Sequence, residues 1–133
     1  MTMEPITVKK VIPFDSKIAG DIAITAAEGG IGYWSVIDSY HPSRWTEWDD
    51  SLGNIEVADD FVFYTIRYED PIFDGRATMD ITPELIRHGI QVALDMGLRS
   101  DLLAQLSDPL DEMDSEAADC VIQCGAFGEV VFG

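Results

Sequence analysis

Two cysteines and two histidines are the residues with which this chain could bind zinc. Cys120 and Cys124 are four residues apart, while His41 and His88 lie in other parts of the sequence. Structural zinc sites are usually built from pairs such as C-x2-C and H-x3-H, and neither pair is present. Because cysteines of this kind are more often core residues, we interpret both thiols as part of the core and predict no metal site.

A nucleophilic enzyme would need a serine or cysteine beside a histidine and an orienting acid. The sequence has no G-x-S-x-G motif, and Cys124 has the apolar and small neighbours Ile122 and Gly125, which is typical of a packed thiol. In the helix expected there, Cys120 and Cys124 are poorly placed for a disulfide, so we expect reduced thiols. We predict no catalytic residue and no cofactor. An enzyme or a structural component of unknown type stays open as an alternative.

Acidic residues between 108 and 116 are candidate ligands for a hard cation. Asp108, Asp111 and Asp114 recur every three residues, whereas an EF-hand loop alternates ligands every two residues and has glycine at its sharp turn. We therefore interpret these acids as loop and helix-cap residues.

The segment 28–34, EGGIGYW, is rich in glycine but follows a predicted helix. Phosphate loops lead into the N-terminus of a helix, where the helix dipole is positive, and here the order is reversed. A helix stop with close backbone packing explains the glycines better than a phosphate site.

The segment 44–50, RWTEWDD, has the composition of a protein interface. Two tryptophans three residues apart are surrounded by acids, and interface hot spots consist of aromatic anchors with a charged rim. The alternative is that both tryptophans cover a sheet edge as core residues. We predict a partner-binding surface formed by Trp45, Glu47, Trp48, Asp49, Asp50, Asp59, Asp60, Asp70 and Asp74.

The chain as a whole is strongly acidic, because 25 Asp and Glu against 8 Lys and Arg give a net charge of −17 on 133 residues. The excess is uneven, since residues 47–133 hold twenty of the acids and only four of the bases. Such a field repels nucleic acid and anionic membranes and attracts basic protein surfaces. The chain is also 47% apolar with thirteen aromatics, a composition that excludes intrinsic disorder.

The apolar pattern predicts one α+β domain over residues 1–133, with a mostly antiparallel sheet of three to five strands and about four helices packed on it. Strands are expected at 6–12, 33–40, 55–68, 76–81 and in the terminal FGEVVFG. Helices are expected from Asp15 or Ser16 to Gly29, from Thr82 to Gly97, from Ser100 to Asp108, and from Asp114 or Ser115 to Ala126. No apolar run approaches the ~18 residues of a membrane span, so we expect a cytosolic protein.

Three segments carry a resemblance to known proteins: 26–35 (AAEGGIGYWS), 80–94 (DITPELIRHGIQVAL) and 118–133 (ADCVIQCGAFGEVVFG). They resemble an uncharacterised family of small bacteriophage proteins, notably from actinobacterial phages, that end in a helix followed by FGE-V-V-x-G. The resemblance covers about a third of the chain, and residues 44–76 have no counterpart in it. It implies a phage-encoded accessory protein that acts in the cytoplasm of an infected bacterium, and it supplies no mechanism.

Charge, composition and resemblance together predict a non-enzymatic inhibitor, of the anti-defence or anti-restriction type, that binds a basic host or defence protein. A DNA mimic is the sharpest version, because a globule of this size matches a length of duplex with about 21 phosphate charges. Neither direct nucleic-acid binding nor membrane binding is expected.

Two further expectations concern a ligand and self-association. The main alternative function is a sponge for a small signalling nucleotide, whose basic residues would be Lys9, Lys10, Lys17 and Arg44. The small-residue helix 117–126, with the apolar segment 130–132, offers a face for a homodimer.

Overall fold

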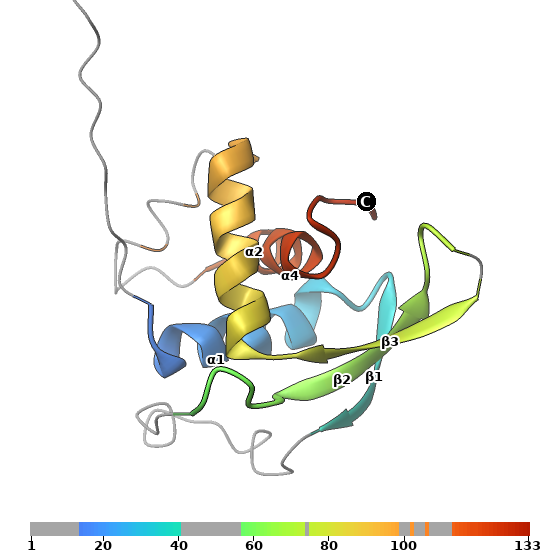
Figure 1. Ribbon diagram of the computed structural model, residues 1–133, viewed down its shortest axis with the longest axis horizontal. Coiled ribbons are helices and arrows are strands. Elements are labelled where there is room, and N and C mark those ends of the chain that lie inside the picture. Colours follow the sequence, from blue (N-terminus) through green and yellow to red (C-terminus); the bar gives the residue numbers. More distant parts are fainter. Residues whose placement is uncertain (1–13, 41–56, 74, 99–101, 103–105, 107–112) are drawn as a thin grey trace, which may run out of the picture.

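The computed structural model describes residues 14–40, 57–73, 75–98, 102, 106 and 113–133, and within them the protein is α+β (Figure 1). The sheet has three antiparallel strands in the order β1-β2-β3: Ser35–Tyr40, Tyr64–Glu69 and Arg76–Ile81. The described helices are α1 (Ser16–Thr25), α2 (Pro83–Met96) and α4 (Ser115–Phe127). The predicted class is confirmed, with fewer described helices than the four expected. The expected strand at 6–12 and most of the helix at 100–108 lie outside the described residues.

The sheet buries one face and exposes the other. Along β2, the side chains of Tyr64, Ile66 and Tyr68 are buried, whereas Arg67 and Glu69 between them are exposed. This alternation is the period of two that a half-buried antiparallel strand requires. The three helices gather on one side of the sheet (Figure 1). The hydroxyl of Tyr64 donates a hydrogen bond of 2.8 Å to the carbonyl of Ala23, which ties the buried face to α1.

One expected strand is shorter than predicted, and another does not form. The strand expected at 55–68 begins only at Tyr64, because Ala58 and Phe61 form a turn in which the Phe61 N–H donates to the Ala58 carbonyl. The strand expected in FGEVVFG does not form. The left-handed Gly128 (φ +77°) ends α4, and the backbone beyond it bonds to a side chain of α4 instead of a neighbouring strand.

The first helix passes into a π-helical turn, Ala26–Gly30, before the chain reaches the sheet. The predicted cap is present, since the Asp15 carboxylate accepts from the Ile18 N–H at 2.9 Å. A Cβ atom at Gly30 would lie 2.7 Å from the Ser115 carbonyl oxygen. The predicted close backbone packing is therefore present at Gly30, against α4, whereas a Cβ atom at Gly32 would meet no atom within 4 Å.

Helices α2 and α4 cross with their backbones in close contact. A Cβ atom at Gly89 would overlap the carbonyl oxygen of Val121, and one at Gly125 would overlap the carbonyl oxygen of Leu85. The small-residue face that we predicted on the last helix is thus used within the chain. A homodimer stays a prediction, and of the two parts of its predicted face the terminal segment keeps an exposed apolar side chain, Val130.

Candidate functional site

The described acids of the predicted partner surface do not form one patch. Asp59 and Asp60 are exposed in the turn before β2, and Asp70 follows the other end of β2. A six-residue strand spans roughly 17–20 Å, so the two groups are separated by about that length. The other residues of the predicted surface lie outside the described residues: Trp45, Glu47, Trp48, Asp49, Asp50 and Asp74.

The turn between β2 and β3 presents two large apolar side chains to solvent. In this hairpin tip (residues 70–73), Ile72 is 71% exposed and Phe73 is 73% exposed. Asp70 Oδ1 accepts hydrogen bonds from the Phe73 and Ile72 backbone N–H groups at 3.0 and 2.9 Å. These two donors lower the pKa of Asp70 below its usual value. The Asp70 N–H donates to the Gly75 carbonyl at 2.8 Å, so the tip is an ordered turn.

From this turn the sequence analysis selected only the acids Asp70 and Asp74, as part of the partner-binding surface. The signal that pointed further was the apolar pair Ile72-Phe73, placed directly after Pro71 between Asp70 and Asp74. A turn that projects away from the core leaves such a pair exposed to solvent. Large exposed apolar side chains often mark interaction sites.

A second cluster is built around Asp119, which lies on α4. Its Oδ1 accepts hydrogen bonds from Trp34 Nε1 at 2.8 Å and from Gln123 Nε2 at 2.9 Å. Its Oδ2 accepts from the Tyr33 hydroxyl at 2.5 Å. Burial of that hydroxyl, followed by its hydrogen bond to Asp119, raises the pKa of Tyr33 to about 12. The ring of Tyr33 is nevertheless mostly in solvent, because the side chain is 61% exposed.

The same cluster holds the C-terminal segment in place. Gln123 is fully buried, and its Oε1 accepts from the backbone N–H groups of Val131 and Phe132 at 2.9 and 2.8 Å. The Phe132 ring stacks on Trp34 with a centroid distance of 4.9 Å and an interplanar angle of 7°. Two of the three segments on which the phage-family resemblance rests, 26–35 and 118–133, therefore meet here. Tyr33, Trp34, Asp119, Gln123 and Phe132 thus form a structural clasp that fastens the C-terminal segment to the domain.

A groove of about 560 Å³ opens beside this clasp at one end of the sheet. We call it the sheet-end groove. Its side chains include Tyr33, Arg67, Tyr68, Glu69, Arg76 and Phe132. It therefore combines aromatic rings with one carboxylate and two of the four basic residues that the structure describes.

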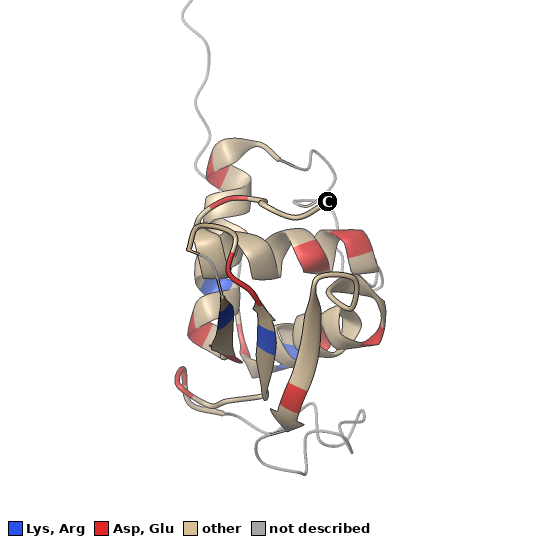
Figure 2. Cartoon of the chain, turned by 90° about the vertical axis from the view of Figure 1, so that its right-hand side faces the viewer, with Lys and Arg blue, Asp and Glu red and all other residues tan. Residues whose placement is uncertain are grey.

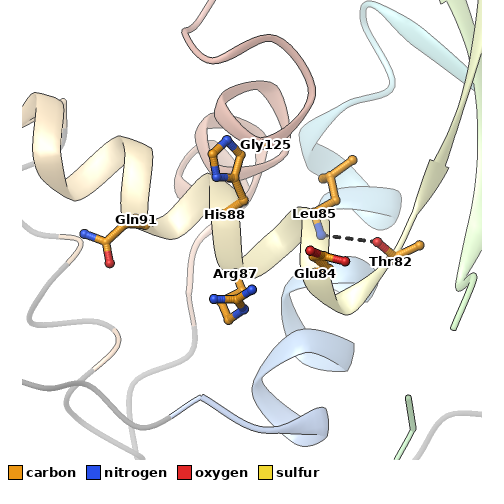
Figure 3. Close-up of a pocket in the computed structure, with 7 residues that line it drawn as sticks. All are labelled: Thr82, Glu84, Leu85, Arg87, His88, Gln91 and Gly125. Atoms are coloured by element: carbon orange, nitrogen blue, oxygen red, sulfur yellow. Dashed lines mark hydrogen bonds between the residues drawn. The ribbon is translucent and has the colours of Figure 1, made fainter. Parts of the chain in front are cut away.

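A second hollow, of about 470 Å³, lies along α2 next to α4 (Figure 3). Its titratable side chains are Glu84, Arg87 and His88, and Figure 3 shows that Arg87 and His88 leave α2 in opposite directions. The hydrogen bond drawn in this view joins the Leu85 N–H to Thr82 Oγ1 at 3.2 Å, and it caps the helix. The residues that line this hollow thus offer no pair of groups arranged for acid–base catalysis.

Both cysteines are packed in the interior as free thiols. Cys120 and Cys124 are both buried and form no disulfide, as expected. Burial, and then the neighbouring Cys120, raise the pKa of the Cys124 thiol to about 12, so the thiolate that would attack a substrate is scarce at neutral pH.

Within the described ranges, no group of three or more His, Cys, Asp and Glu side chains is arranged to hold a metal ion. The helices of those same ranges are also too short or too polar to cross a membrane.

Comparison with known proteins adds no assignment to this geometry. The chain matches no protein-family model, no curated protein and no solved structure.

Proposed function

We propose that the protein is a phage-encoded, non-enzymatic inhibitor that binds a basic host or defence protein in the bacterial cytoplasm. The observation that carries this proposal is the hairpin tip, where Ile72 and Phe73 are held in solvent by an ordered turn. Aromatic residues are enriched at the centres of protein interfaces, and anchors that are already ordered lose little entropy on binding. The tip is thus suited to insert into a pocket on a partner.

The charge around the tip supports a basic partner. The described residues include fifteen Asp and Glu but four Lys and Arg, so most of the negative charge has no counterion within this part of the protein. Three ion pairs are present there, all between exposed side chains, and such pairs change stability little. Figure 2 shows acidic segments spread over helices, loops and a strand. A distributed negative field accelerates association with a positive surface.

DNA mimicry stays a prediction within this proposal. It requires carboxylates in rows on one face, and Asp59 and Asp60 lie at the opposite end of β2 from Asp70. These acids of the predicted surface therefore do not form one row within the described residues.

The test is affinity capture of bacterial proteins with five versions of the chain. We expect the wild type to retain a basic protein and the Ile72→Ser/Phe73→Ser variant to lose it. The matched control is Met96→Ser/Leu98→Ser, which removes two exposed apolar side chains at the end of α2 and should retain the partner. Charge reversal at Asp59 and Asp60 should weaken capture.

Equal charge reversal at Glu28 and Glu129, both exposed, controls for the change in net charge. Retention of the same proteins by the wild type and the tip variant would contradict the proposal, as would recovery of acidic proteins alone.

A further inference from the structure

We propose that the sheet-end groove is a second binding site, for a small molecule that joins an aromatic ring to a phosphate, such as a nucleoside phosphate. This site goes beyond the protein-binding surface, because its residues differ from those of the hairpin tip. It also differs from the cluster that the sequence suggested for a nucleotide. Of that cluster, Lys17 pairs with Asp21 at 3.1 Å, and Lys9, Lys10 and Arg44 lie outside the described residues.

The strand register brings two arginines together at the groove. Arg67 is opposite Thr78 in the β2–β3 pair, and Arg76 is opposite Glu69, so the two arginines are diagonal neighbours on the exposed face of the sheet. Diagonal neighbours are within reach of each other's long side chains. Their guanidinium groups can therefore approach one phosphate from two sides, and arginine binds phosphate through paired N–H donors.

Neither arginine is held tightly by a carboxylate. Arg67 Nη1 lies 3.6 Å from Asp38 Oδ1, and Arg76 Nε lies 3.9 Å from Glu69 Oε1. Both distances exceed those of a charge-assisted hydrogen bond. The arginine side chains are 45% and 73% exposed. A phosphate can displace these loose contacts at small cost, since exposed ion pairs of this kind contribute little.

Tyr33 supplies a fixed aromatic surface at the same groove. Its hydroxyl is held by Asp119, and also accepts from Gln123 Nε2 at 3.2 Å, while most of the side chain faces solvent. An aromatic side chain that is exposed yet anchored can stack on a planar ring without losing much freedom, and stacking on a nucleobase is worth about 1–3 kcal/mol. The volume of about 560 Å³ lies within the usual size of small-molecule sites.

Among the surfaces that the structure describes, electrostatics favour this groove for an anion. With a net charge of −17, the protein repels anions at a distance, so an anion can be held only where bases concentrate. Arg67 and Arg76 are two of four described bases, and Figure 2 shows basic segments on neighbouring strands of the sheet. The other two described bases, Lys17 and Arg87, lie on different helices.

The test is calorimetric titration of the full chain with adenosine and guanosine 5′-monophosphates, with the corresponding nucleosides, and with inorganic phosphate. We expect a monophosphate to bind more tightly than either its nucleoside or phosphate alone. The variant Arg67→Gln/Arg76→Gln should lose at least about tenfold in affinity, because each lost charged hydrogen bond is worth about that factor. Tyr33→Leu should weaken the nucleotide but leave inorganic phosphate unchanged.

The matched control is Arg87→Gln, which removes one positive charge from the exposed side of α2 and should keep the wild-type affinity. Three results would overturn the proposal: no binding of either monophosphate at millimolar concentration, equal binding of inorganic phosphate, or an equal loss in the Arg87 control. Protein capture should be unaffected in Arg67→Gln/Arg76→Gln, so failure of this site and failure of the inhibitor proposal are distinguished.

Discussion

Among single residues, Asp119 and Gln123 determine how the C-terminal segment is attached to the domain. Asp119 accepts hydrogen bonds from three side-chain donors, and the fully buried Gln123 uses its carbonyl oxygen for two backbone N–H groups. Buried polar groups stabilise a fold only when they are satisfied, and an unsatisfied donor costs about 1–3 kcal/mol. These side chains therefore carry a structural role that their acidic and polar character alone does not reveal.

We predict that Asp119→Asn lowers the free energy of unfolding by about 1–3 kcal/mol. Asparagine keeps one acceptor oxygen for Trp34 and Gln123 but turns an amide N–H toward the Tyr33 hydroxyl, so the hydrogen bond that Tyr33 donates to this position is lost. Urea denaturation followed by tryptophan fluorescence measures the change. The control is Asp95→Asn, which affects one exposed hydrogen bond from Gln91 and should leave stability almost unchanged. Equal stability of the two variants would contradict the role assigned to Asp119.

The raised pKa of Tyr33 predicts a dependence of stability on alkaline pH. In the unfolded chain the hydroxyl titrates near its ordinary value of 10.0, and in the folded protein near about 12. Stability from this group is fully present below pH 10 and is lost as the pH rises from 10 to about 12, because the unfolded state releases its proton first.

This dependence is measured as the free energy of unfolding from pH 8 to pH 11, in the wild type and in Tyr33→Phe. The wild-type curve should fall more steeply above pH 10. The burial of Tyr68 raises its pKa as well and contributes equally to both proteins. Parallel curves would show that folding does not raise the pKa of Tyr33.

At the level of elements, the crossing of α2 and α4 joins the two helices that were easiest to predict. Each helix contributes one glycine, Gly89 or Gly125, where the partner backbone leaves no room for a Cβ atom. The crossing also places Asp119 and Gln123 of α4 where the clasp needs them.

We predict that Gly89→Ala destabilises the protein by about 1–3 kcal/mol or more, because the added methyl group meets the backbone of Val121, which cannot rotate away. In a helix that lacked this contact, the same change would stabilise. Gly32→Ala is the control, since no atom lies within 4 Å of its added Cβ atom. Thermal and urea unfolding of both variants decide the point, and unchanged stability in Gly89→Ala would rule out the close crossing.

For the whole molecule, charge acts on folding and on association in opposite directions. The net charge of −17 makes the folded state repel itself, and the same charge attracts a basic partner. Salt screens both effects over a Debye length of about 10 Å at 0.1 M.

We therefore predict that raising the ionic strength from about 10 mM to about 500 mM increases the free energy of unfolding while it weakens capture of the partner. Urea denaturation and affinity capture at matched salt concentrations measure the two responses. Capture that is insensitive to salt would argue against an electrostatic interface, even if the hairpin tip proved essential.

Structural features that depend on neighbouring residues could be predicted from the amino-acid sequence. The Thr82 cap, the proline at the start of α2 and the left-handed Gly97 at its end are all found as predicted, because capping is settled within about four residues. The Asp114 cap of α4 was predictable for the same reason. The strand 76–81 also lies where the sequence predicted it.

Contacts between residues that are distant in the sequence could be recognised only in the folded protein. Trp34 and Asp119 are 85 positions apart, so no local pattern could pair them. The segment after Gly128 has the composition of a strand, yet its N–H groups bond to Gln123, and that competition is invisible in a local pattern. Strand register likewise makes Arg67 and Arg76 diagonal neighbours. The exposure of Ile72 and Phe73 depends on which face of the sheet the helices cover.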